Sequence, residues 1–346
     1  MKDKDRYWDC LDQAIEASNG GRTDEALAWL DEALKVEPNG AEAHNSRGEI
    51  LWDEGKFEDA LYEFELATKA DPKFLTAHLN RAELLIEDLG EYEQAIEQCD
   101  ELLAGRSELA KPDKATESEI YYLKSKSLFY MDDLEGALFL VRRALRTGGE
   151  HALFRAFEGQ VLFELANYEE ARRQLEHAVA LDPDSAHAVY HLGLVLERLG
   201  EHEEAQKAFA RANALSPETY LVPVEMSEDE FREVAAEAIA DIPRSMRRYV
   251  EEVPLLVEDF PSKELLREQN VSPQVLGLFI GVPRTAASVT AQPNDLEARV
   301  ILFKKNLEKI CQDRSELVDE IKKTVRHEVG HYLGLDEDDL ERLGLA

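Results

Sequence analysis

The sequence is poor in cysteine, and it contains no long apolar run. Its 346 residues include three cysteines, Cys10, Cys99 and Cys311, which lie far apart and form no CxxC pair. This spacing excludes a disulfide framework and a zinc site built from thiolates, and it suits a reducing compartment. No stretch approaches the ~20 apolar residues of a membrane span, and residues 1–10 lack the apolar segment of a signal peptide. We therefore expect a cytoplasmic protein that does not associate with a membrane.

Basic residues are also scarce relative to acidic ones. The chain has 40 lysines and arginines against 73 aspartates and glutamates, which gives a formal net charge of −33. Nucleic acids and anionic membrane surfaces carry the same sign of charge and are repelled. Basic or amphipathic protein segments are therefore the expected partners.

A pattern with a period of 34 residues fills the first 219 positions. It is clearest in residues 41–74, where the marker positions hold Gly48, Ala60, Phe64, Ala67 and Pro72. Small residues let the two helices of a hairpin approach closely, a bulky residue fills the gap to the next hairpin, and proline ends the second helix. The pattern closely resembles the tetratricopeptide repeat. In this register the repeats are residues 7–40, 41–74, 75–104, 118–151, 152–185 and 186–219, of which the third and fourth are less regular. The polar stretch 105–117 between those two is either a longer loop or a helix extension.

The resemblance implies a concave surface, lined mainly by the first helix of each repeat, that binds an extended peptide or a partner helix. The candidate groove residues are Trp8, Asn45, Glu49, Trp52, Tyr122, Lys126 and Tyr190, and further candidate positions on this surface are Leu11, Leu79, Glu83, Phe129, Gln160 and Leu194. Lys126 is the only cation in this set, whereas a clamp for a C-terminal carboxylate needs several. Aromatic groups beside acidic ones suit a basic or amphipathic peptide. For each single aromatic residue, ordinary packing between helices is the alternative.

Residues 220–346 follow a different pattern. Ser227 and Glu230 form a capping box that predicts a helix to about residue 240. The segments that follow are three β-rich stretches at 253–257, 275–281 and 299–303, a short helix near 306–311, and a long helix over 316–333. The expected fold class is thus an α-helical tetratricopeptide solenoid over 1–219, followed by a small α/β domain over 220–346.

The last helix carries the HExxH motif of a zinc site, with His327, Glu328 and His331. Histidines four residues apart on a helix lie one turn above each other, so both imidazoles can reach one ion, and the glutamate between them can reach a water on that ion. An apolar stripe recurs every four residues on the same helix, at Leu317, Ile321, Val325 and Val329. Because His327 and His331 each follow a stripe residue by two positions, they face away from the buried side. The alternative is a pair of exposed histidines without a metal.

Asp336 and Glu337, the two acidic residues after the motif, are candidates for a third ligand. Gly334 suits a left-handed helix C-terminus, which would direct the chain that follows back toward the site. Another pair, His187 and His191, has the same spacing but lacks both the glutamate and the acidic continuation, so we expect no metal there.

Residues from about 228 to 343 resemble the bacterial minimal zincin-like family of possible zinc metallopeptidases. The segments that carry the resemblance are 231–243, 256–261, 276–281, 300–303 and 324–326, and the longer pattern HExxHxxGxx(D/E) ends at Glu337. The resemblance implies a zincin fold, peptidase chemistry and Glu337 as third ligand, with Asp336 as the alternative.

We therefore predict a zinc-dependent metallopeptidase with one Zn²⁺ per chain, in which the repeats recruit a protein substrate or partner. Glu328 would take a proton from the attacking water and pass it to the leaving amine. The alternative function is a protein-protein interaction adaptor whose zincin-like domain binds metal with little or no turnover. An intact Glu328 favours the enzyme, because structural zinc needs no general base.

Overall fold

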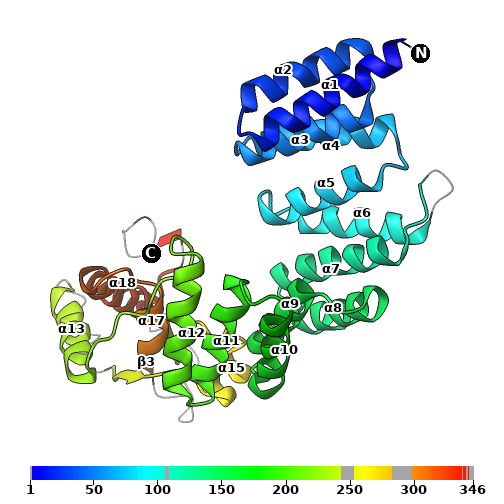
Figure 1. Cartoon of the computed structure of the whole chain (residues 1–346). Coiled ribbons are helices and arrows are strands. Elements are labelled where there is room, and N and C mark those ends of the chain that lie inside the picture. The colour runs from blue at the N-terminus through cyan, green and yellow to red at the C-terminus, as the bar shows by residue number, and fades with distance from the viewer. Residues whose placement is uncertain are drawn as a thin grey trace. The chain divides into compact units, whose positions relative to one another are not determined.

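A computed structural model describes residues 2–105, 109–242, 253–282, 298–336, 338–339 and 342 (Figure 1). Contacts divide the chain into two compact units, residues 1–161 and 162–346, which are called the first and the second unit below. Over the described residues, no helix is both long and apolar enough to cross a membrane.

The first unit consists of helical hairpins stacked in chain order. Its helices are α1 (Lys2–Asn19), α2 (Thr23–Val36), α3 (Ala41–Asp53), α4 (Phe57–Ala70), α5 (Leu75–Glu87), α6 (Tyr92–Ala104), α7 (Lys114–Tyr130), α8 (Leu134–Gly148) and most of α9 (Ala152–Glu164). The marker residues pack as the repeat pattern predicts, since a Cβ atom on Gly48 would lie 2.6 Å from the ring of Phe64. In the polar stretch before the fourth repeat, residues 109–113 are irregular and α7 begins at Lys114, where Asp113 caps the helix by accepting from the Thr116 N–H.

The second unit begins with the last repeats and continues into a mixed α/β region. Its elements are α10 (Tyr168–Leu181), α11 (Ala186–Arg198), α12 (His202–Leu215), α13 (Glu228–Asp241), β1 (Leu255–Glu258), α15 (Lys263–Gln269), β2 (Gly277–Ile280), β3 (Arg299–Phe303), α17 (Lys304–Lys309) and α18 (Arg314–Leu333). The strand order is β1-β3-β2, with β1 parallel and β2 antiparallel to β3. The predicted solenoid followed by a small α/β region is confirmed.

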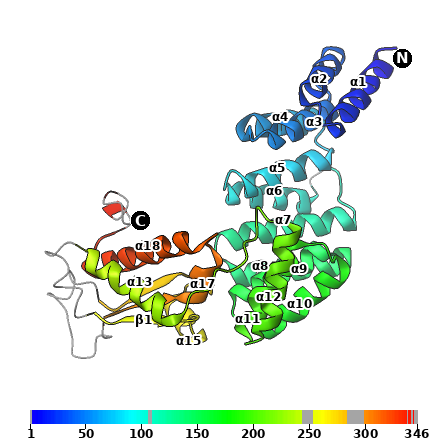
Figure 2. The ribbon, with the colours of Figure 1, turned by 60° about the vertical axis from the view of Figure 1, so that its left-hand side comes forward.

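Helices cover both faces of this small sheet (Figure 2). On one face, Val300 and Leu302 of β3 pack into a core with α13 and α18. On the other face, the alternating residues Ile301 and Phe303 pack with Leu265 of α15. The sequence analysis did not predict α15, whose seven residues are too few to show a helical period. Ser262 caps α15 through the Leu265 N–H, and Asn270 ends it with a left-handed φ of 51°.

Buried polar contacts join α11 to the α/β region within the second unit. Glu197 accepts a 2.5 Å bond from the Lys309 ammonium, and the two side chains are 9% and 5% exposed. Next to this pair, Arg198 donates to Asn306 Oδ1 at 3.0 Å and lies over the ring of Phe260. The last repeat is therefore attached to the α/β region by ionic and cation-π contacts as well as by chain connectivity.

Candidate metal centre

Helix α18 carries the HExxH residues, and both of its ends are set by local sequence. Asp313 caps the first turn by accepting from the Ser315 and Glu316 N–H groups at 2.8 and 3.0 Å. Gly334 ends the helix in the left-handed conformation with a φ of 84°, and the Leu335 N–H then donates to Gly330 O at 3.1 Å. This termination places the motif in the last two turns of α18.

The two motif histidines point to a common place. The Nε2 atoms of His327 and His331 are 3.0 Å apart, and their rings are inclined by 87°. Both side chains are partly exposed, whereas the four residues of the predicted apolar stripe are all buried. The orientation of α18 is thus the one that its sequence period predicts.

The spacing of the imidazoles tests whether zinc fits here. Two nitrogens bound at about 2.0–2.1 Å to one tetrahedral ion are separated by roughly 3.3 Å. The observed 3.0 Å needs only a small outward movement of His327 or His331. The pair therefore fits two positions of a zinc site.

Glu328 is held against the edge of the sheet. Its side chain is 8% exposed, and its Oε2 accepts a 2.7 Å hydrogen bond from the Phe279 N–H of β2. A carboxylate offers about four acceptor positions, so one such bond orients Glu328 without using up its capacity to accept a proton. The ring of Tyr332 lies against that of Phe279, with the centroids 5.7 Å apart.

The contact between α18 and β2 depends on a glycine that the sequence analysis did not identify as part of the site. A Cβ atom on Gly277 would lie 2.7 Å from Thr324 Cγ2 and 3.1 Å from Glu328 Cγ. Only glycine therefore allows the helix to approach this closely. A glycine inside a strand is itself a known sign of such an approach, and it was the available signal.

Among the residues that the structure describes, no third ligand lies beside the two histidines. Asp336 is exposed, and its Oδ1 accepts from the Asp339 N–H at 2.9 Å. Glu337 lies outside the described residues. Within the parts of the chain that the structure describes, no three histidine, cysteine or acidic side chains are arranged to hold a metal ion. In the second pair with this spacing, His191 is buried and its Nδ1 lies 3.0 Å from His187 O.

The candidate groove residues in the first unit have mixed environments. Trp8 is 43% exposed, whereas Asn45 and Glu49 of α3 are tied to Asn80 of α5 by hydrogen bonds of 2.8 to 3.1 Å. Trp52 donates its indole N–H to Asp88 at 2.6 Å. These three bonded side chains have a role in joining consecutive repeats.

The remaining groove candidates also have neighbours. Lys126 pairs with Glu87 and lies 5.6 Å from the ring centroid of Tyr122. In the second unit, Tyr190 packs against Tyr220 with the ring centroids 4.7 Å apart. Tyr190 is thereby in contact with the segment that follows the last repeat.

Comparison with known proteins matches both parts of the chain. Residues 250–345 match the zincin-like metallopeptidase family, and residues 11–73, 54–110 and 158–218 match the tetratricopeptide repeat family. No curated protein matches the chain.

Among solved structures, the chain is similar to PilF of Pseudomonas aeruginosa, with 16% identity, a TM-score of 0.53, and coverage of 68% of this chain and 100% of that one. It is also similar to the type IV pilus biogenesis factor PilW, with 17% identity, a TM-score of 0.54, and coverage of 62% and 94%. At these identities the likeness shows the fold alone.

Proposed function

Because the chain carries tetratricopeptide repeats within residues 11–218 and a C-terminal domain of the zincin-like metallopeptidase family over 250–345, we propose that it is a zinc-dependent peptidase that recruits a protein through its repeats. His327 and His331 would be metal ligands, with Glu337 as third ligand and Asp336 as the alternative. Glu328 would be the general base. One zinc ion per chain is expected.

The observation that carries the proposal is the arrangement of the motif on α18. The two Nε2 atoms lie 3.0 Å apart on the side of the helix away from the core, and the carboxylate between them is fixed by the Phe279 N–H. The spacing of four residues brings the two rings together on any helix, and the fixed carboxylate between them is what distinguishes this pair from His187 and His191. Burying a carboxylate costs free energy unless hydrogen bonds compensate it, and the Phe279 N–H supplies such a bond to Glu328, which is 8% exposed.

The chemistry follows from the roles of these side chains. A zinc ion in a site of this kind supplies a Lewis acid for the scissile carbonyl and lowers the pKa of a water. Glu328 then takes the proton of the attacking water and returns it to the leaving amine. The bond from the Phe279 N–H holds the carboxylate in one orientation during both transfers. Partial burial of Glu328 keeps competing water away from this proton path.

Metal content and cleavage of a peptide library or casein, measured on the same samples, test the proposal. The unmodified chain is expected to carry about one zinc ion and to cleave the substrate. Glu328→Gln should keep the zinc and lose roughly 10²–10⁴-fold in kcat, because the base is removed while both ligands remain. His331→Ala should lose both the zinc and the activity.

Glu320→Gln is the matched control, since Glu320 is a partly exposed glutamate two turns earlier on α18. It should retain zinc and activity. Absence of zinc from the unmodified chain would overturn the metal site. Equal losses of activity in Glu320→Gln and Glu328→Gln would remove Glu328 from the mechanism.

A second candidate function, an adaptor with little turnover, is favoured by a different observation. The described residues bring only two ligands together, and the 3.0 Å separation of the rings is also compatible with a hydrogen bond between His327 and His331. In that case the repeats perform the function and the α/β region is a binding module. Zinc bound by the unmodified chain without any cleavage would support the adaptor.

A further inference from the structure

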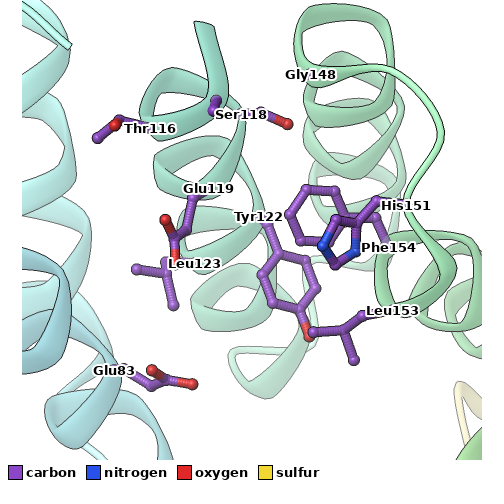
Figure 3. Close-up of a pocket in the computed structure, with 11 residues that line it drawn as sticks. Glu83, Thr116, Ser118, Glu119, Tyr122, Leu123, Gly148, His151, Leu153 and Phe154 are labelled. Carbon is purple, nitrogen blue, oxygen red and sulfur yellow. The ribbon is translucent and has the colours of Figure 1, made fainter. Parts of the chain in front are cut away.

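A pocket of about 320 Å³ opens on the first helices of three consecutive repeats in the first unit (Figure 3). Its walls come from α5, α7 and the beginning of α9. The side chains that define it are Glu83, Glu119, Tyr122, Leu123, His151 and Phe154. Two of these, Glu83 and Tyr122, are on helix faces that the repeat pattern assigns to the groove.

One side of the pocket is a stack of aromatic rings. His151 lies over Phe154 with the centroids 4.2 Å apart and the planes inclined by 22°. Phe154 in turn stacks on Tyr122 at 4.4 Å and 23°. Phe157 also contacts Tyr122 in a T-shaped arrangement, with the ring centroids 5.5 Å apart. These contacts leave the rings few alternative rotamers, so the wall is preorganised for a planar or cationic group.

The other side of the pocket is acidic. Figure 3 shows the carboxylates of Glu83 and Glu119 across from the rings of Phe154 and His151. Among the described residues, neither carboxylate takes part in a hydrogen bond or an ion pair. Glu83 is partly buried, and Glu119 lies at the exposed rim. Two negative charges from different helices therefore converge on one opening without a cation between them.

Electrostatics inside the protein does not neutralise this pair. Partial removal from water raises the pKa values of Glu83 and Glu119, while Lys126 opposes the shift at Glu83 and His151 opposes it at Glu119. The ammonium group of Lys126 is paired with Glu87. A cation bound in the pocket would stabilise the ionised form of both carboxylates, which burial disfavours.

We propose that this pocket binds one arginine side chain of an extended peptide. Its volume lies at the lower end of the range of roughly 300–1,000 Å³ for small-molecule sites, so it admits a single side chain and no folded element. A guanidinium group is planar and can lie against the aromatic stack while it donates to a carboxylate on the opposite side. The ammonium group of lysine is a point charge without a flat face, so it would stack less well on the aromatic rings.

This assignment rests on the proposed function in one respect, because it specifies what the repeats recruit. It names the partner as a segment with an arginine in extended conformation, which agrees with the net charge of −33. The pocket itself lies wholly within the first unit, and its binding can be measured without any turnover.

Binding of short peptides to the full-length Glu328→Gln chain tests the assignment. The probes are three sets of fluorescent pentapeptides, blocked at both ends, with arginine, norleucine or glutamate fixed at the centre and mixtures elsewhere. Fluorescence anisotropy should show at least tenfold tighter binding of the arginine set than of the norleucine set. Glu83→Gln and Glu119→Gln should each weaken the arginine set about 5- to 20-fold and leave the norleucine set unchanged.

Glu97→Gln is the matched control. Glu97 is an exposed carboxylate on α6, in a depression lined by Glu93, Asp100 and Glu101 but by no aromatic residue. It removes the same charge from the same unit and should change binding of the arginine set less than twofold. Equal effects of all three variants would show diffuse attraction and overturn the pocket. So would equal binding of the arginine and norleucine sets, or no binding of any set at 1 mM peptide. Since the assay needs no cleavage, these failures are distinct from a failure of the peptidase proposal.

Discussion

Two buried histidines outside the candidate metal centre have pKa values that are shifted in opposite directions. The Nδ1–H of His44 in α3 donates a 2.6 Å hydrogen bond to the Glu63 carboxylate of α4, and this contact raises the pKa of His44 against the opposing effect of burial. His191 of α11 is fully enclosed, and burial beside His187 lowers its pKa to about 3. One of these histidines is therefore stabilised as a cation and the other as a neutral ring.

The two shifts predict opposite pH dependence. The His44–Glu63 contact stabilises the fold fully below pH ~6.5, the unfolded pKa, and this contribution is lost as the pH rises through the raised folded pKa. The contribution of neutral His191 is complete above pH ~6.5 and is lost as the pH falls toward 3. In urea unfolding, His44→Gln should therefore destabilise the chain more at pH 6 than at pH 8. His191→Gln should destabilise it less at pH 5 than at pH 8, and pH dependence of the same sign in both variants would contradict this account.

Residue types at a fixed spacing were enough to predict the convergence of His327 and His331, because helix geometry alone converts a separation of four residues into a shared direction. The partner of Glu328 could not be predicted in this way. It is a backbone N–H, that of Phe279, and lies 49 residues earlier in the chain. Every residue except proline carries such a donor, so nothing in the side-chain pattern marks the one that is used.

At the scale of elements, α18 and the strands were predicted within a few residues, whereas α15 was not. The apolar stripe of α18 extends over several turns, and β3 was predicted at its observed bounds, Arg299–Phe303. The helix α15 has seven residues, and its presence depends on the packing of Leu265 against the second face of the sheet. That burial is a tertiary effect, which a periodicity of fewer than two turns cannot reveal.

The C-terminal end of α18 provides a prediction for the element as a whole. Gly334 adopts a φ of 84°, a conformation that costs an alanine about 1 kcal/mol. Gly334→Ala should lower the free energy of unfolding by about this amount and should also weaken zinc binding, because it disturbs the turn that follows His331. Calorimetric titration of the chain with zinc measures the second effect. Gly55→Ala has a similar φ, 73°, and open space around it. It should cost similar stability in the first unit and leave zinc affinity unchanged, and equal zinc affinities in both variants would contradict a link between the helix end and the metal.

At the scale of the whole molecule, the repeat signature and the pattern of contacts divide the chain at different residues. The signature continues to residue 219, because each hairpin carries its own marker residues. Contacts, however, group residues 162–346 into one compact unit that includes α10, α11 and α12. The polar residues that make this connection, among them Glu197 and Lys309, lie outside the marker positions. They therefore look like surface residues in the sequence.

The Glu197–Lys309 pair gives a test of this connection. Lys309→Met removes the cation and leaves Glu197, whose side chain is 9% exposed, without its closest partner. Breaking a buried pair on one side costs about 3–5 kcal/mol, whereas replacing both members by apolar groups is often close to neutral. We therefore expect Lys309→Met to destabilise the second unit by about 3 kcal/mol, and the double variant Glu197→Leu with Lys309→Met to recover most of that loss.

The distribution of tryptophan provides an internal reference for this measurement. All three tryptophans, Trp8, Trp29 and Trp52, belong to the first unit, so their fluorescence follows that unit during urea unfolding. Hydrogen exchange of peptides from α11, α17 and α18 follows the second unit. If the buried pair joins the last repeat to the α/β region, Lys309→Met should accelerate exchange in all three helices together and leave the fluorescence midpoint nearly unchanged. Faster exchange in α17 alone would mean that the pair stabilises only its surroundings. If the pair connects two parts of one cooperative unit, its loss must accelerate exchange in both parts.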